Sequence, residues 1–270
     1  MTTTSERAIF HKDAGRRDFR LSVLELAGVG VGSSVGEALA TTTDLAVHAE
    51  QLGYHRFWVA EHHGMPAVAS SAPAVLLAHI ASRTSTIRVG SGGVMLPNHA
   101  PMVVAEQFGT LEALHPGRID LGLGRAPGSD QLTAYALRRR MDGAGSDDFA
   151  DQLAELQHFM NGDFPADHPF SRIRTTPASP VPVYILGSSD YGARLAAYPY
   201  SPAELDLIGG MASTEVVGSV ETVQQGLDEL ADRFGVHEML ISTRAHGAAA
   251  KHRSMELIAE AYALRGRVAN

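Results

Sequence analysis

The chain has 270 residues, 44% of them hydrophobic and 19% charged, so it can bury one large core and is expected to form a single domain over residues 1–270. Its formal net charge of -8 argues against nucleic acids and anionic membrane surfaces as partners, because both attract clusters of Lys and Arg. The absence of Cys from the sequence excludes disulfides, thiolate metal sites and thiol nucleophiles.

Short apolar runs alternate with amphipathic segments along the chain, which is the pattern of parallel strands joined by helices. The first three units pair strands at residues 21–26, 56–60 and 87–91 with helices at 36–52, 72–83 and 102–114. Gly53 is expected to end the first helix. The later units are predicted to contain strands at 119–124, 183–186 and 239–242 and helices at 149–160, 189–197, 219–234 and 248–265, with Ser219 as an N-cap.

This alternation indicates a barrel or an open parallel sheet, and the chain length favours a (β/α)8 TIM barrel of about 250 residues. Six strands are two fewer than a closed barrel needs, and the shortage lies where Ala197 is followed directly by Tyr198. Because an opened barrel would expose apolar strand edges, we expect a segment to be missing from this sequence near 197/198, with a natural deletion as the alternative. Residues 126–148 form a long connection after the fourth strand, and we predict that they are a mobile cover.

Catalytic groups of a parallel barrel lie just after the carboxyl ends of its strands. Five stretches of this sequence occupy such positions and contain residues suited to chemistry or to binding. They are Glu25-Leu26-Ala27, Glu61-His62-His63, Gly92-Gly93, Gly124-Arg125 and Gly187-Ser188-Ser189. We expect the active site at this edge, at the strand end that contains the two histidines.

The run Glu61-His62-His63 places imidazoles that titrate near neutral pH beside a carboxylate, a combination that can take or hold a proton. A divalent metal site and a hydrogen-bonded structural role are the alternatives. Adjacent histidines alternate sides on an extended strand, and no third ligand stands at a suggestive spacing. A structural role is favoured over a catalytic one for Glu61 itself.

The other strand ends offer contacts to an anion and to a flat ligand. Arg125 is placed to bind a phosphate or to form a salt bridge with an acidic neighbour. Gly187-Ser188-Ser189 opens a helix, where free backbone N–H groups bind phosphate, although a serine there can also be a simple cap. Glycines in the run 90–93 mark either a bulge or the close approach of a flat ligand.

These stretches resemble the bacterial-luciferase-like, flavin-dependent monooxygenase family. The resemblance is carried in order by residues 49–63, 89–97, 105–107, 115–118 and 122–125, and more weakly by 186–189 and 217–219. Together these stretches span most of the chain. The resemblance implies a (β/α)8 barrel that holds FMN at the carboxyl ends of its strands.

The resemblance also implies roles for individual residues. His62 corresponds to the family's catalytically important histidine, with His63 and Glu106 nearby. Cofactor contacts are implied for Leu26, Ala27, Gly124 and Gly187, with Arg125, Ser188 and Ser189 on the FMN phosphate. Gly92-Gly93 matches the place where the family often has a non-prolyl cis peptide under the flavin ring.

The reaction implied by the resemblance is activation of O2 by reduced FMN to a flavin peroxide, which oxygenates a small organic substrate. Reduced FMN is then expected from a separate flavin reductase, and a homodimer is expected because dimers are common in the family. A noncatalytic flavin-binding protein with a shortened barrel and a deazaflavin-dependent dehydrogenase on the same fold are the alternatives. Residues 1–20 lack the apolar core of a secretory signal, so we expect a cytoplasmic protein without a membrane span.

Overall fold

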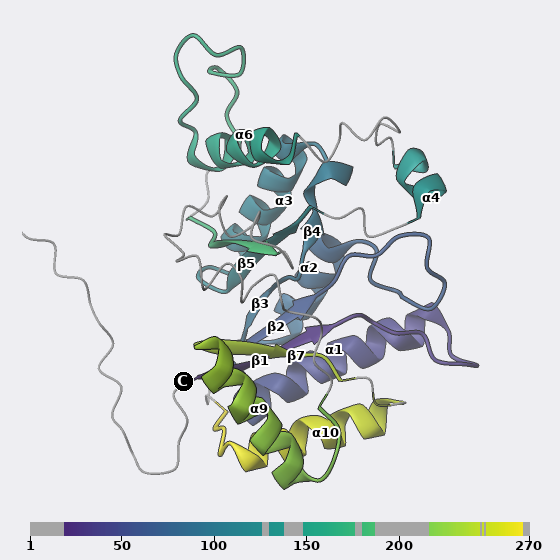
Figure 1. The fold of residues 1–270 in the computed structure, drawn as a ribbon. Coiled ribbons are helices and arrows are strands. Elements are labelled where there is room, and N and C mark those ends of the chain that lie inside the picture. Colours follow the sequence, from purple (N-terminus) through teal and green to yellow (C-terminus); the bar gives the residue numbers. More distant parts are fainter. Residues whose placement is uncertain are drawn as a thin grey trace, which may run out of the picture.

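The computed structural model describes residues 19–125, 130–137, 148–175, 180–186, 216–243, 245 and 247–266. Its strands form one parallel sheet in the order β4-β5-β3-β2-β1-β7, and β6 pairs with β5 outside that path (Figure 1). The strands are β1 (Arg20–Glu25), β2 (Arg56–Val59), β3 (Arg88–Ser91), β4 (Val94–Met95), β5 (Ile119–Gly124), β6 (Val183–Leu186) and β7 (Glu238–Ile241). All six predicted strands are present, and the two-residue β4 is additional.

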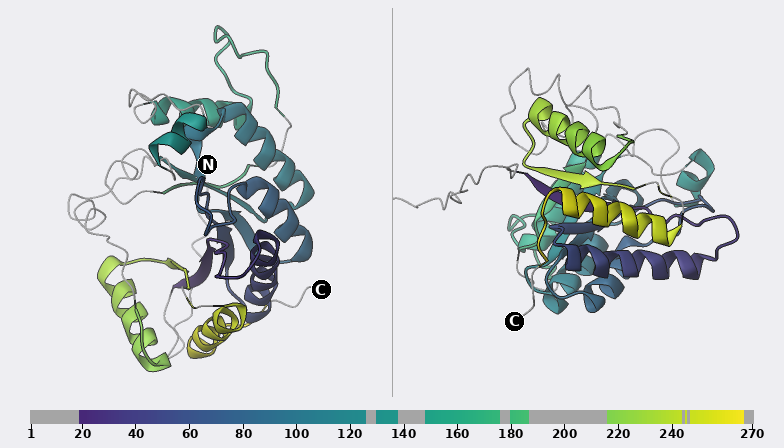
Figure 2. Two further views of the ribbon diagram at one scale, coloured as in Figure 1. Left: turned by 90° about the vertical axis from the view of Figure 1, so that its right-hand side faces the viewer. Right: turned by 90° about the horizontal axis from the view of Figure 1, so that it is seen from below.

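Helices pack beside one another around this sheet in the order α9, α10, α1, α2, α3, α6, and Figure 2 shows α1, α2 and α3 along one side of the curved sheet. Their bounds are α1 (Val35–Leu52), α2 (Pro73–Arg83), α3 (Pro101–Leu114), α6 (Phe149–Asn161), α9 (Val220–Phe234) and α10 (Ala248–Ala261). The 3-10 helix η1 (Leu96–Asn98) and the short α4 (Gln131–Ala136) complete the described helices. None of the described helices is both long enough and apolar enough to cross a membrane.

Local signals in the sequence set the ends of several helices. Gly53 ends α1 with a φ of 90°, in the left-handed region that glycine tolerates. Ser219 caps α9 by accepting a hydrogen bond from the N–H of Thr222. The last helix ends at Ala261, whereas its amphipathic pattern had predicted Arg265.

Three sequence predictions concern residues outside the described ones. The helix at 189–197 and the junction of Ala197 and Tyr198 lie in the gap between β6 and α9. Much of the connection 126–148 also lies outside, and its described middle forms α4, with Asp130 as N-cap. The α4 helix was not predicted, because no apolar repeat marks it.

The amino ends of the strands share a buried network of charges. Arg56 of β2 donates to Asp120 Oδ2 at 2.7 Å and to Glu238 Oε1 at 2.8 Å. Arg88 of β3 donates to Asp120 Oδ1 at 3.0 Å through Nε, and the Trp58 indole N–H donates to Oδ2 at 3.2 Å. Asp120 is completely buried, so the two guanidinium groups provide the compensation that a buried carboxylate needs.

His55 lies at the same end of the sheet, where its Nε2 is 3.1 Å from Nη1 of Arg20. Because a guanidinium can only donate, the imidazole accepts this bond through a nitrogen that carries no proton. Burial lowers the pKa of His55 to about 4; Glu238 opposes the shift and the neighbouring arginines reinforce it. His55 is therefore neutral in the folded protein at neutral pH.

Replacing Asp120 with Ala is expected to destabilise the protein by about 3–5 kcal/mol, because Arg56 and Arg88 would be left without their buried counter-ion. The free energy of unfolding from urea titrations measures this loss. The matched control is Asp167→Ala, an exposed aspartate, which should change stability by less than about 0.5 kcal/mol. Equal effects of the two substitutions would show that the network contributes nothing to folding.

Acidification should destabilise the protein through His55. The pKa of this residue is about 4 in the folded state, against an ordinary 6.5, so the unfolded chain binds a proton first as the pH falls. The His55 contribution is therefore fully present above pH 6.5 and is lost as the pH falls toward about 4. Urea unfolding across this window measures how far the free energy of unfolding falls with pH. The fall should be smaller in His55→Gln than in the wild type. His79→Gln, at an exposed position of α2, should show the same fall as the wild type.

Candidate active site

The loops that follow β1 and β2 pair with each other at the carboxyl edge of the sheet. Gly28 and Val68 form an antiparallel bridge, and the N–H of Ala69 donates to the carbonyl of Ala27 at 2.9 Å. The Ser70 hydroxyl donates to the carbonyl of Ala60 at 2.5 Å. The main chain at Ala60 is therefore bound to the later part of the same loop.

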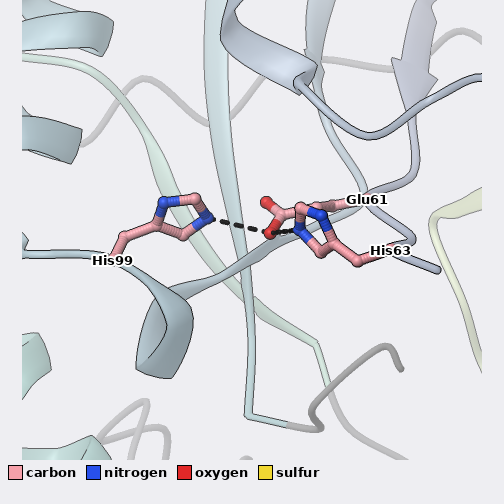
Figure 3. Close-up of side chains that lie close together, drawn as sticks. All are labelled: Glu61, His63 and His99. Carbon is pink, nitrogen blue, oxygen red and sulfur yellow. Dashed lines mark hydrogen bonds and ion pairs between the residues drawn. The ribbon is translucent and has the colours of Figure 1, made fainter. Parts of the chain in front are cut away.

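Glu61 binds two histidines from separate segments of the chain (Figure 3). Its Oε1 lies 2.8 Å from Nε2 of His63 and 2.8 Å from Nε2 of His99, while Oε2 accepts the N–H of Met95 at 3.2 Å. Glu61 is completely buried, whereas the side chains of His63 and His99 keep 16% and 28% of their surface exposed. The two imidazoles thus connect a buried carboxylate to the surface of this edge.

Glu61 is ionised because its partners outweigh the cost of burying it. Burial on its own raises the pKa of this carboxyl. The hydrogen bond and charge of His99, with the hydrogen bonds from His63 and the Met95 N–H, nevertheless lower the pKa below its ordinary 4.5. The cluster therefore centres on a negative charge at neutral pH.

His62 is half-buried, and its main chain is bound to a later residue of the loop after β2. Its N–H donates to the carbonyl of Ser70 at 2.9 Å. Within the part of the chain that the structure describes, its imidazole forms no hydrogen bond or ion pair. His62 and His63 therefore differ, because only the His63 ring is oriented by a carboxylate.

The glycines of the run 90–93 are required by the packing of the strands. Gly90 pairs in register with Trp58 and Asp120, so it is not a bulge. A Cβ on Gly90 would lie 2.6 Å from the carbonyl oxygen of Asp120, and one on Gly93 would lie 2.8 Å from the carbonyl oxygen of Gly122. The Gly92–Gly93 peptide is cis, as the family resemblance implied.

The remaining predicted cofactor residues that are described lie at the same edge. Ala27 is buried after β1, with a φ of 53°, and its N–H donates to Glu25 Oε1 at 3.0 Å; Leu26 beside it is half-buried. Gly124 ends β5 and the half-buried Arg125 follows it. Gly187, Ser188 and Ser189 fall outside the described residues.

Glu106 is not brought into the Glu61 cluster. It is half-buried in α3, and among the described residues its side chain makes no hydrogen bond or ion pair. Its proximity to His62, implied by the resemblance, stays a prediction.

Two residues at this edge were not expected from the sequence. His99 reaches Glu61 across 38 positions of sequence, because β3, β4 and η1 return the chain to this point. Lys251 of α10 donates to Glu25 Oε1 at 2.6 Å, and both side chains are largely buried. A basic residue in the first turn of the helix after the last strand was the only sequence signal for Lys251.

The structure corrects the expectation that Glu61-His62-His63 has no third partner for a metal site. Glu61, His63 and His99 place three potential ligand atoms within 4.8 Å of one another, and two imidazoles with a carboxylate can bind divalent metals. An ionised carboxylate only accepts hydrogen bonds, however, so in this arrangement both Nε2 atoms carry hydrogens. The geometry is that of a hydrogen-bonded cluster.

Comparisons with known proteins identify the family of this chain. The luciferase-like monooxygenase family matches residues 19–205. A luciferase-like monooxygenase of Escherichia coli is 54% identical over 178 residues, which are 65% of this chain and 52% of that protein. An N-acetyl-S-alkylcysteine monooxygenase of Bacillus subtilis is 45% identical over 180 residues, or 66% of this chain and 54% of that protein. The chain thus spans about half the length of the curated relatives it matches.

Solved structures share the fold over nearly the whole chain. Apo-MsnO8 is 30% identical with a TM-score of 0.79, covering 92% of this chain and 100% of that one. The oxygenating constituent of 3,6-diketocamphane monooxygenase from Pseudomonas putida, in complex with FMN, has a TM-score of 0.67 at 14% identity, over 90% of this chain and 97% of that one. An F420-dependent secondary alcohol dehydrogenase has a TM-score of 0.63 at 13% identity, over 93% of this chain and 100% of that one. The α/β fold is therefore the TIM-barrel-like fold expected from the sequence, and the chain belongs to the luciferase-like monooxygenase family.

Proposed function

We propose that this protein is a flavin-dependent monooxygenase that uses reduced FMN and O2 to oxygenate a small organic substrate. The observation that supports this most is the position of His62 and His63, in the loop after β2 at the carboxyl edge of the sheet, in a chain of the luciferase-like monooxygenase family. Reduced FMN supplies two electrons, so that one oxygen atom enters the substrate and the other leaves as water. A separate flavin reductase would supply the reduced FMN.

The residues at the carboxyl edge suit a flavin. Ala27, Gly93 and Gly124 are buried at the ends of three strands, at positions where the family resemblance implies contacts with the cofactor. The guanidinium of Arg125 can bind a phosphate through two parallel hydrogen bonds. These residues would hold FMN, with Arg125 on its phosphate.

His62 is the residue that we assign to proton handling during oxygenation. Its ring is half-buried at this edge and is not bound to any described side chain, so a ligand can approach it. An imidazole takes or gives a proton near neutral pH.

His62→Ala should leave FMN binding within about twofold of the wild type and lower oxygenation by roughly 100-fold, the scale of a lost acid–base group. The measurements are a fluorescence titration with FMN and O2-dependent product formation. An N-acetyl-S-alkylcysteine is the first substrate to try, because a relative is named for acting on one. His79→Ala, at an exposed position of α2, is the control, and unchanged turnover in His62→Ala would remove His62 from the mechanism.

Arg125→Ala should weaken FMN binding about 10- to 100-fold, because a hydrogen bond to a charged group contributes about 1.5–3 kcal/mol. Riboflavin, which lacks the phosphate, provides the matched control and should bind the variant and the wild type equally. Equal weakening of both ligands would place Arg125 against another part of the flavin.

An F420-dependent dehydrogenase is the second candidate, because a protein of that activity shares the fold with a TM-score of 0.63. Hydride transfer to a deazaflavin needs no oxygen, so turnover under anaerobic conditions would favour the dehydrogenase. FMN that binds but is reoxidised by O2 at the rate of the free cofactor would instead favour a noncatalytic flavin-binding protein.

A further inference from the structure

We propose that Glu61 is a positioning residue that fixes His63 and His99 in the same tautomer, with the hydrogen on Nε2 and the lone pair on Nδ1. As far as turnover is concerned, this inference rests on the proposed function. The tautomers themselves can be measured without any activity.

The geometry places a hydrogen on both Nε2 atoms. Both Nε2 atoms lie 2.8 Å from the same oxygen of Glu61. A carboxylate without a proton has no hydrogen to give, so each nitrogen must donate. In a neutral imidazole with hydrogen on Nε2, the other nitrogen is the acceptor.

The carboxylate is held so that it cannot turn away from the two rings. Its second oxygen accepts the Met95 N–H at 3.2 Å, and its whole side chain is excluded from solvent. Three donors from the loop after β2, from β4 and from the residue after η1 thus meet at one buried group. Moving Glu61 would leave these donors without an acceptor, which costs free energy inside a protein.

This arrangement makes Nδ1 the nitrogen of His63 that can accept a hydrogen. Its Nδ1 forms no hydrogen bond to a described residue and carries the lone pair, so it can accept a hydrogen bond or a proton from a ligand. A proton gained at Nδ1 makes the ring positive while Nε2 still donates to Glu61, whose negative charge stabilises it. A carboxylate that orients a histidine in this way acts through the histidine and need not touch the substrate.

Imidazole ¹⁵N chemical shifts distinguish the two tautomers and provide the test. In the wild-type protein above the pH at which the rings are protonated, His63 and His99 should both show hydrogen on Nε2. In Glu61→Gln the amide oxygen can face the two rings or the Met95 N–H but not both, and its NH2 group donates on the other side. The amide should therefore occupy both orientations, and the rings should show a mixture of tautomers. Glu37→Gln is the matched control, because Gln can replace this exposed carboxylate in the capping box of α1.

A second variant separates positioning from simple loss of structure. His99→Gln removes one partner but leaves the Glu61–His63 pair, so the His63 tautomer should stay as in the wild type. Circular dichroism and thermal unfolding establish that each variant is folded. A wild-type His63 with hydrogen on Nδ1, or tautomers unchanged in a folded Glu61→Gln, would overturn the proposal.

Turnover provides an additional readout if oxygenation is found. Glu61→Gln should lower kcat roughly 10- to 100-fold, the usual loss on removing a supporting hydrogen bond, with KM little changed and an altered pH profile. Absence of oxygenation in the wild type would reject the proposed function and leave the tautomer result standing. Displacement of the Nε2 hydrogens by added Zn²⁺ at stoichiometric concentration would instead make the cluster a metal site and overturn the positioning role.

Discussion

The Asp120 carboxylate binds Arg56 through one oxygen and Arg88 through the other, and the strands around it are arranged by that charge. Its side chain is completely buried, so neither guanidinium can leave without a large loss of electrostatic energy. Glu238 accepts the Nε–H of Arg56 through both of its oxygens and thereby joins β7 to β2 across the intervening β1. Four strands of a single sheet are consequently fixed by ions at their amino ends.

Small and polar residues lie at the carboxyl edge, opposite the charged network of the amino ends. Gly90 shows how the two ends are connected, since a Cβ there would lie 2.7 Å from the Trp58 nitrogen that binds Asp120. A strand that must pass so close to the network cannot carry a side chain at this point. Beyond it, Gly92 and Gly93 continue the run of small residues to the edge where Glu61 gathers its histidines.

Much of the fold and part of the site could be predicted from the sequence. Apolar runs identify the six strands, because strands buried on both faces of a parallel sheet are continuously hydrophobic. Gly53 and Ser219 end and begin helices through interactions with their nearest neighbours. The cis peptide at Gly92–Gly93 was expected only from the family resemblance.

Contacts between distant residues were beyond sequence reasoning. Arg56 and Glu238 are 182 positions apart, and no local pattern marks them as partners. His99 was missed for a similar reason, since its approach to Glu61 depends on how β4 and η1 turn the chain. The resulting error was to count only adjacent histidines as partners of the carboxylate.

The ion pair of Glu25 and Lys251 makes the first strand depend on the last helix. These side chains are 226 positions apart, and the carboxylate also accepts the N–H of Ala27 at the start of the first edge loop. During synthesis, the amino-terminal half of the sheet leaves the ribosome long before Lys251 exists. Until then the carboxyl end of β1 holds a carboxylate without its cation, so this part of the edge is completed only after the segment that contains Lys251 has been translated.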